Sequence, residues 1–264
     1  MASFLNAYVA PKKEIPRQAY ITVSTIVVAT IIALWCMLSY GGMVRSDFLP
    51  TPYDVALAAI SGLQDGSLLV NTGVSVTEIM SGFIIASVFA VPLGILMGSF
   101  KIAEAALEPV TNFVRYLPVS ALIPLLILWV GIDIEEKISV IFIGTFFQQL
   151  IMIADVSRSV SQDLLDVSYT LGAGRRTVIW RVLVPATMPG VMDTLRVTLG
   201  WAWTYLVVAE LVAANKGLGY FILNSMRGLF TDQIFLGIMV IGLLGLVSDQ
   251  VFKLLRNRLL PWAD

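Results

Sequence analysis

Ionisable side chains are rare inside the long apolar runs of this sequence, and each is a candidate for function. Glu210 and Asp249 lie within such runs, whereas Asp193 and Arg196 are spaced three residues apart and are predicted to pair with each other. Glu210 suits either a structural hydrogen bond or a gate. Asp249 suits either a contact between helices or a position near an interface.

Neutral polar side chains in the same runs offer hydrogen-bond donors along which an anion could pass. A pore for an anion requires such donors and perhaps one cation, rather than a ring of carboxylates. The same side chains also suit hydrogen bonds between helices and aromatic anchoring at a membrane interface. Together with Glu210, the candidates for a translocation pathway are Thr145, Gln148, Gln149, Trp201, Trp203 and Thr204.

The composition excludes several kinds of chemistry and one class of protein. The 264 residues include no histidine and one cysteine, Cys36, which removes disulfides and nearly all His/Cys metal sites. The commonest general base is therefore also missing. Charged residues make up 13% of the chain, against about 25% in soluble domains. With 58% hydrophobic residues and a mean hydropathy of +0.86, the chain is predicted to be an all-α integral membrane protein.

Six transmembrane helices are predicted from runs of apolar residues. The third should be kinked or broken by Pro118 and Pro124, and Arg115 near its inner end should reach the lipid headgroups. Gly94 and Gly98 form a G-x-x-x-G typical of close helix packing. The predicted spans are residues 21–40, 79–100, 113–131, 138–154, 194–214 and 234–254.

The distribution of Lys and Arg predicts the orientation of these spans. Thirteen lie in the two terminal segments and the loops on their side, and four lie in the alternate loops. Because positive residues accumulate on the cytoplasmic side, both termini should be cytoplasmic. The chain is therefore expected to be one transmembrane domain, residues 1–264. Within it, residues 1–20 form a cytoplasmic tail, and residues 155–193 form a cytoplasmic loop between helices four and five.

The loop after the first span predicts a short amphipathic helix on the outer surface. Thr51 suits the N-cap, Pro52 suits the first helical position, and Asp54 suits the capping partner. The helix should run to about Leu63. It could serve as a simple interfacial connector or as a docking surface.

The long inner loop predicts two helices separated by a glycine. Leu164, Val167, Ser168 and Leu171 follow helical spacing, and Gly172 then suits a left-handed helix end. A second helical stretch should be stopped by Pro185. Its apolar face includes Val178, Ile179, Val182 and Leu183. An isolated helix pair cannot bury its apolar stripe alone, so the loop should contact a partner protein or lie on anionic lipid.

The segment from residue 166 to residue 185 resembles the E-A-A-x3-G-x9-I-x-L-P loop of bacterial ABC importer permeases. Gly172 and Pro185 occupy the glycine and proline positions, and the spacing is kept throughout. The departures are Asp-Val-Ser for Glu-Ala-Ala and Val for both Ile and Leu. Further fragments favour the nitrate, sulfonate and taurine branch, among them Leu49-Pro50-Thr51-Pro52, Pro92-Leu93-Gly94, Trp201-Ala202-Trp203 and Gly217-Leu218-Gly219-Tyr220.

This resemblance implies the permease subunit of an ATP-driven importer in a bacterial inner membrane, for nitrate, bicarbonate, taurine or another sulfonate. It implies a homodimer with two cytoplasmic ATP-binding subunits, which hold ATP and Mg, and an extracytoplasmic solute-binding protein. Membrane lipid is the remaining partner, and no nucleic acid is expected. The loop would be a coupling helix seated on the ATPase, and its residues are Asp166, Val167, Ser168, Leu171, Gly172, Arg175 and Pro185.

The sequence contains no G-x-x-x-x-G-K-[ST] phosphate loop, so the chain is predicted to be a non-catalytic subunit without a cofactor of its own. Two other classes of membrane protein would have a different sequence pattern. An integral membrane enzyme should show clustered acidic residues or histidines at one membrane face. An ion-coupled secondary transporter should show embedded carboxylates and internal repeats. The sequence shows no such cluster of acidic residues or histidines, and no internal repeat.

Overall fold

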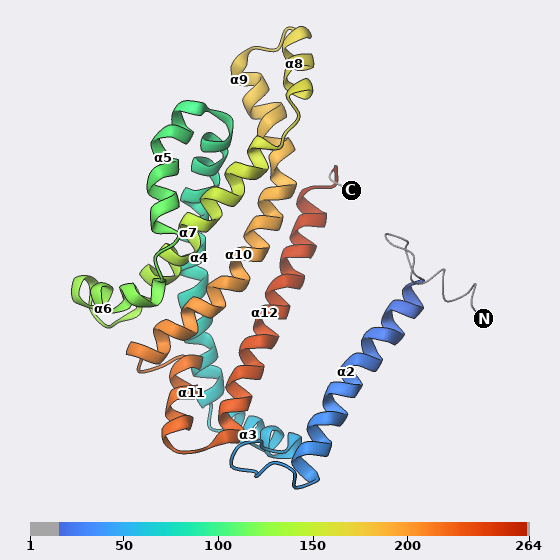
Figure 1. Ribbon diagram of the computed structural model, residues 1–264, viewed down its shortest axis with the longest axis vertical. Helices are drawn as coiled ribbons and strands as arrows, with labels where there is room; N and C mark the ends of the chain where they lie inside the picture. Colours follow the sequence, from blue (N-terminus) through green and yellow to red (C-terminus); the bar gives the residue numbers. More distant parts are fainter. Residues whose placement is uncertain (1–15, 263–264) are drawn as a thin grey trace.

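The computed structural model describes residues 16–262, and the described part is built of helices joined by short connections (Figure 1). Residues 1–15 of the predicted tail, including Lys12 and Lys13, lie outside it. The elements are α2 (Arg17–Tyr40), α3 (Pro52–Gln64), α4 (Ser67–Ser99), α5 (Lys101–Val114), α6 (Val119–Val130), α7 (Ile134–Arg158), α8 (Gln162–Thr170), α9 (Arg175–Val178), the π-helix η1 (Ile179–Leu183), α10 (Val184–Ala213), α11 (Leu218–Arg227) and α12 (Thr231–Leu259).

Five helical segments of the described chain are long and apolar enough to cross a membrane: α2, α4, α7, α12 and the continuous stretch α9–η1–α10. The pair α5 and α6 makes a sixth span if it is counted as one broken crossing. The all-α membrane fold predicted from the sequence is therefore confirmed. The spans are longer than the apolar runs, because each helix continues into polar turns at its ends.

The third predicted span was wrong in its position. It was placed at 113–131, whereas α5 already begins at Lys101 and the chain bends by 96° between α5 and α6. The break falls at Pro118, whose backbone is extended (ψ 113°), and a proline also disfavours the helical conformation of the residue before it. Pro124, also expected to break or kink the span, instead lies within α6. The helix α5 contains polar residues such as Glu104 and Glu108, so its sequence does not form a continuous apolar run.

One end of the bundle is formed by α3, α11 and the helix ends that meet them, and α8 and α9 lie at the opposite end. We call these the outer end and the inner end, after the orientation predicted from the positive residues. The predicted cap of α3 is confirmed: the Asp54 backbone N–H donates to the Thr51 hydroxyl at 3.2 Å, and the Thr51 N–H donates to the Asp54 carboxylate at 3.1 Å. At the other end of α3, hydrogen bonds from Ser67 lower the pKa of the exposed Asp65 carboxyl. The helix α2 is attached here through Trp35, whose indole N–H donates to the Pro50 carbonyl at 3.0 Å.

The centre of the bundle is the pair α4 and α7, which pack along their lengths. Three glycines of α4 allow the two backbones to approach closely: an added Cβ on Gly82 or Gly94 would lie 2.8 Å from Ile141 or Ile153 of α7, and one on Gly98 would overlap the Ala154 carbonyl. The close packing predicted for the G-x-x-x-G at 94–98 is confirmed.

The helix that contains Pro185 does not stop there, which corrects the prediction. The turn η1 immediately before it is a π-helix, in which the Val184 N–H donates to the Ile179 carbonyl five residues earlier. Proline lacks an N–H and its ring crowds the carbonyl one turn back, so a widened turn lets the helix pass through. The α9–η1–α10 segment therefore runs without interruption from the inner end into the membrane.

The pair predicted between Asp193 and Arg196 is also wrong. Arg196 donates to Asp249 of α12, and Lys253 lies 2.8 Å from the same carboxylate. Asp193 lies 3.7 Å from Arg256. The Arg196–Asp249 and Asp193–Arg256 pairs join α10 to α12, so Asp249 is a contact between helices.

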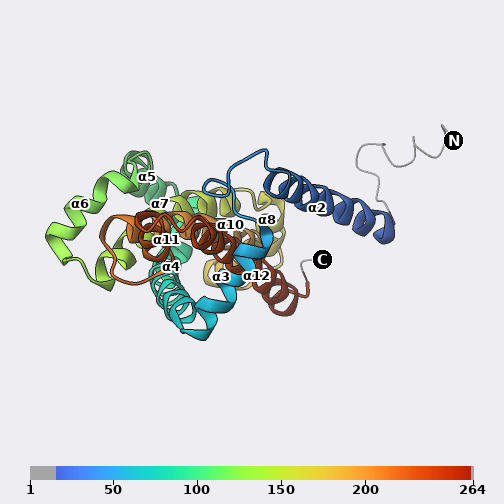
Figure 2. The same cartoon turned by 90° about the horizontal axis from the view of Figure 1, so that it is seen from below.

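Figures 1 and 2 show α6 and α2 on opposite sides of the bundle. In Figure 1 the helices α8 and α9 lie at the upper end, and α3 and α11 lie at the lower end. The helix α2 runs down towards α3, and α12 runs up from the lower end. The first residues of α2 and the last of α12 therefore point to the same end of the bundle as α8 and α9.

Candidate functional site

Glu210 is fully buried near the outer end of α10, where its carboxylate is hydrogen-bonded to α4 and α11. Its carboxylate accepts a hydrogen bond from the Ser75 hydroxyl of α4 at 2.5 Å and one from the Gly219 backbone N–H of α11 at 2.5 Å. The Ser75 oxygen accepts a bond from the Leu218 N–H, and Asn71 accepts one from Gly217, both at 2.8 Å. We call Asn71, Ser75, Glu210 and the backbone of residues 217–219 the outer clamp.

Two glycines make the outer clamp possible. Gly217 has a φ of +113°, a conformation that favours glycine, and a Cβ there would overlap the Glu210 carboxylate. A Cβ on Gly219 would lie 2.7 Å from the Glu210 Cβ. The sequence singled out Glu210 but not its partners. Ser75 lies 135 residues earlier in the chain, and α11 was not predicted as a helix.

A second group of buried charges lies between the outer ends of α4 and α7. Lys137 Nζ is 3.2 Å from the Glu136 carboxylate and donates to the Ile132 carbonyl at 2.5 Å. Glu78 is also buried and lines, with Lys137 and Lys216, a hollow of about 200 Å³. These residues were not among the candidates from the sequence, because Glu78, Glu136 and Lys137 lie just before the predicted starts of the second and fourth spans.

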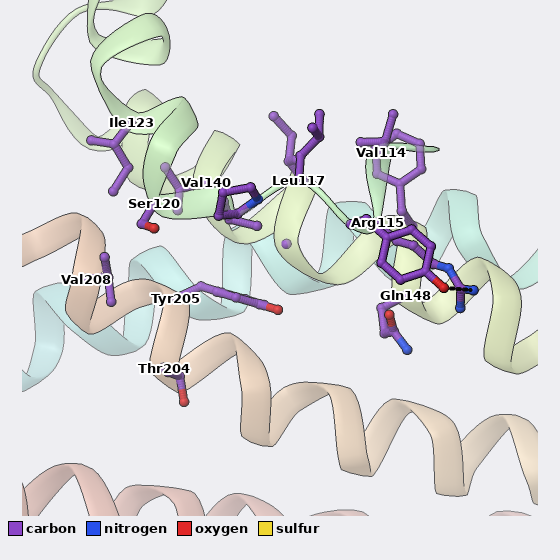
Figure 3. Close-up of a pocket in the computed structure, with 16 residues that line it drawn as sticks. Val114, Arg115, Leu117, Ser120, Ile123, Val140, Gln148, Thr204, Tyr205 and Val208 are labelled. Atoms are coloured by element: carbon purple, nitrogen blue, oxygen red, sulfur yellow. Dashed lines mark hydrogen bonds between the residues drawn. The ribbon is translucent and has the colours of Figure 1, made fainter. Parts of the chain in front are cut away.

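A hollow of about 420 Å³ lies beside the bend between α5 and α6. Figure 3 shows Arg115 and Gln148 next to each other at one end, with the Tyr205 ring pointing towards them from α10. The polar members of its lining are Arg115, Tyr116, Ser120, Gln148, Thr204 and Tyr205. We call it the bend pocket.

Arg115 therefore does not occupy the place predicted for it. It was expected at the inner end of a span, reaching lipid headgroups, but it follows a whole helix that starts at the inner end. Its Nη2 donates to the Tyr116 hydroxyl at 3.0 Å, and its Nε is buried without a hydrogen-bond partner in the described part of the chain.

The predicted pathway residues fall into two groups. Gln148 and Thr204 come together in the bend pocket, from α7 and α10. The others are placed elsewhere: Thr145 and Gln149 are fully buried, and Gln149 donates to Thr198 at 3.3 Å. Trp203 is buried, Trp201 is exposed, and Glu210 belongs to the outer clamp.

At the inner end, Gly172 ends α8 as predicted, with a φ of +84°. The Gly172 N–H donates to the Tyr169 carbonyl at 2.9 Å and the Ala173 N–H donates to the Ser168 carbonyl at 3.1 Å. These two bonds form a Schellman motif, in which the left-handed residue closes the helix. No atom lies within 4 Å of where a Gly172 Cβ would stand, so glycine is required there by the backbone and not by crowding.

The helix α8 presents apolar side chains to its surroundings. Leu171 is 83% exposed, and Val167 and Leu164 are also exposed, while Val178 and Leu183 of the following segment are buried. Asp166 is held by Gln162 Nε2 at 3.0 Å. The Arg175 guanidinium lies over the Phe100 ring, 5.4 Å from its centroid, and so contacts the end of α4. Of the predicted coupling residues, those on α8 face outwards, whereas Pro185 lies within a continuous helix.

Within residues 16–262 no group of three or more Cys, Asp or Glu side chains is arranged to hold a metal ion. The features that remain are a bundle of spanning helices, a polar pocket at a broken helix and an exposed apolar segment projecting from one end. They define a membrane-embedded transport subunit.

Comparison with known proteins identifies the family. Residues 90–261 match the family described as the binding-protein-dependent transport system inner membrane component, and the chain belongs to it. The chain is 31% identical to the taurine transport system permease protein TauC of Escherichia coli (strain K12), covering 94% of this chain and 92% of that one. It is 33% identical to the putative aliphatic sulfonates transport permease protein SsuC of Bacillus subtilis (strain 168), covering 89% and 86%.

The fold is shared with a solved transporter. The inward-facing MetNI methionine ABC transporter contains a chain that aligns with a TM-score of 0.58 at 18% sequence identity, covering 69% of this chain and 93% of that one. The protein is thus a permease subunit of an ABC importer in the inner membrane. It is a non-catalytic subunit, and ATP hydrolysis is carried out by separate subunits. Membership of this family also implies a solute-binding protein as a partner.

Proposed function

We propose that the permease imports a small sulfonate such as taurine, with nitrate and bicarbonate as the alternative anions. Two copies of the chain would form the pathway, and two partner subunits would bind ATP and Mg on the cytoplasmic side. Both termini and the α8–α9 unit would lie on that side. Support for the substrate class comes from the relatives, which are named for taurine and aliphatic sulfonates.

The exposed α8 is the observation that carries the coupling role. A permease that couples transport to hydrolysis on another chain requires a surface that this chain does not bury itself. Leu164, Val167 and Leu171 form such a surface at the end of the molecule. The Schellman motif at Gly172 fixes the direction in which α8 leaves the following helix. A force applied to α8 would thus reach the spanning helices that flank it, α7 and α10.

The test is reconstitution of the permease with its ATP-binding subunits and solute-binding protein in vesicles. We expect uptake of radiolabelled taurine that requires ATP, and no hydrolysis by the purified permease alone. Unlabelled nitrate and bicarbonate are then added as competitors. If nitrate or bicarbonate reduces the uptake and unlabelled taurine does not, the assignment of a sulfonate substrate is wrong.

A matched pair of glycine variants tests the coupling role. Both Gly172 and Gly174 have open space where a Cβ would stand, but Gly172 has a φ of +84° and Gly174 a φ of −73°. A left-handed conformation costs a residue with a Cβ about 1–2 kcal/mol. Gly172→Val should therefore reduce uptake and the stimulation of ATP hydrolysis by the binding protein, whereas Gly174→Val should change both less. Equal, near wild-type values in both variants would remove the coupling role.

A further inference from the structure

The bend pocket places an arginine deep within the membrane. Glu104 of α5 forms an ion pair with Arg158 of α7 at 3.0 Å, and Lys101 lies beside them, which marks the inner boundary of the bundle. Arg115 follows Glu104 by eleven residues, a rise of about 16 Å along the helix. A hydrocarbon core is about 30 Å thick, so the backbone of Arg115 lies near its middle.

The α7 helix gives the same depth independently. Gln148 precedes Arg158 by ten residues, a rise of about 15 Å. Arg115 and Gln148 line the same hollow, in agreement with these two estimates (Figure 3). The pocket is thus a polar site at mid-membrane depth, reached from three helices and a broken connection.

The hydrogen-bonding groups of the pocket are largely uncommitted. Arg115 has no carboxylate partner in the described chain, and its Nε is buried without an acceptor. Arg115 contacts its neighbour Tyr116 through both the hydroxyl and the ring, with the guanidinium 4.7 Å from the ring centroid. Gln148 of α7 and Thr204 and Tyr205 of α10 supply neutral hydrogen-bonding groups around the same hollow.

An unpaired cation at this depth is costly unless something neutralises it. Two other cations of the spanning helices each lie beside a carboxylate, Arg196 beside Asp249 and Lys137 beside Glu136. Arg115 is the charged residue in a pocket otherwise lined by neutral groups. A guanidinium with free N–H groups beside neutral donors is the arrangement that recognises an oxyanion.

We infer that the bend pocket is an anion-binding site within the membrane. Arg115 and Gln148 contact the sulfonate, or another small oxyanion, while it crosses the membrane. The inference rests on the proposed function for the identity of the anion, but not for the existence of the site. Specificity for the charged end of the solute would then reside partly in the permease and not only in the binding protein.

The site can be tested without any transported solute, through the charge preference of a thiol reagent. Thr204→Cys is introduced into a Cys36→Ser background, and the reaction rates with an anionic sulfonatoethyl and a cationic trimethylammonioethyl methanethiosulfonate are compared in the assembled transporter. Arg115→Gln should lower the anion-to-cation rate ratio on the order of tenfold, as loss of one nearby charge predicts. Arg115→Lys should retain most of the ratio, which shows that the change follows charge and not misfolding.

Taurine uptake in reconstituted vesicles is the second measurement. Arg115→Gln should lower uptake at least tenfold, while binding-protein-stimulated ATP hydrolysis stays within twofold of wild type. Arg45→Gln is the matched control, because Arg45 forms an exposed ion pair with Asp47 and should leave uptake unchanged. An unchanged rate ratio, or wild-type uptake by Arg115→Gln, overturns the inference. Absence of uptake by the wild-type complex overturns the proposed substrate instead, and the rate ratio still decides the role of Arg115.

Discussion

The Ser75 hydroxyl donates a hydrogen bond to Glu210 and at the same time accepts one from the Leu218 backbone N–H, so that one oxygen joins α4, α10 and α11. All three groups are buried. The outer clamp is therefore satisfied only when these helices keep their relative positions. Its geometry gives Glu210 a structural role in this conformation, one of the two roles that the sequence left open.

Removal of the Ser75 hydroxyl should destabilise the protein. Ser75→Ala leaves the buried Leu218 N–H without its acceptor and removes one of the hydrogen bonds to Glu210, which costs about 1–3 kcal/mol and lowers the Tm by roughly 2–12 °C. Thermal unfolding of the purified permease in detergent measures the shift. Ser87→Ala is the control, because the Ser87 hydroxyl bonds only to the Phe83 carbonyl of its own helix. Equal Tm values for the two variants would refute the clamp.

A side chain at Gly217 should be more harmful than one at Gly200. Gly217→Ala adds a Cβ at a φ of +113° and drives it into the Glu210 carboxylate, so both strain and overlap lower the Tm. Gly200 lies in α10 with no atom within 4 Å of a new Cβ, and Ala is favoured over Gly in a helix by about 1 kcal/mol. Gly200→Ala should keep or raise the Tm. A lower Tm for Gly200→Ala than for Gly217→Ala would contradict the assignment.

The contact between α4 and α7 provides a third comparison. A Cβ on Gly94 would lie 2.8 Å from Ile153 and 3.0 Å from the Leu150 carbonyl, whereas a Cβ on Gly73 of the same helix meets no atom within 4 Å. Overpacking of this kind costs about 1–3 kcal/mol. Gly94→Ala should therefore unfold at a lower temperature than the wild type, and Gly73→Ala should not. Indistinguishable unfolding curves would mean that the two helices separate easily at this depth.

The orientation in the membrane is open to direct labelling. Gly174 and Lys216 are exposed at opposite ends of the bundle, and the positive residues predict that Gly174 is cytoplasmic. In a Cys36→Ser background, a membrane-impermeant maleimide added to intact cells should label Lys216→Cys and leave Gly174→Cys unlabelled. Lysis before labelling should expose the second thiol. Labelling of Gly174→Cys in intact cells would reverse the orientation.

Much of the fold could be predicted from local patterns, because each spanning helix must satisfy its own backbone hydrogen bonds in lipid. The apolar runs therefore located most spans, and local capping chemistry located α3. The same reasoning failed for α5, whose Glu104 and Glu108 interrupt the apolar pattern. That error also misplaced Arg115, since its depth depends on where the preceding helix begins.

The contacts of the candidate site could not be predicted in this way, since they join residues distant in sequence. Glu210 was identified as unusual, but nothing local indicates that Ser75 and Gly219 are its partners. Arg196 illustrates the same limit. The nearest acidic residue along its helix is Asp193, but Arg196 forms its ion pair with Asp249 of another helix. By contrast, the left-handed Gly172 was predicted correctly, because a helix end depends on neighbouring residues alone.

The close approach of α4 and α7 has a mechanical consequence. Side chains that separate two helices can change rotamer and let the helices slide, but at Gly82, Gly94 and Gly98 the α7 residues rest directly on the α4 backbone. We expect α4 and α7 to move as one rigid body, which is about 37 Å long when measured along α7. One end of this rigid body continues towards α8, and the other end contains Ser75 of the outer clamp. A tilt imposed by the ATPase at the inner end would thus displace the outer end in the same stroke, without any chain of rearranging side chains between them.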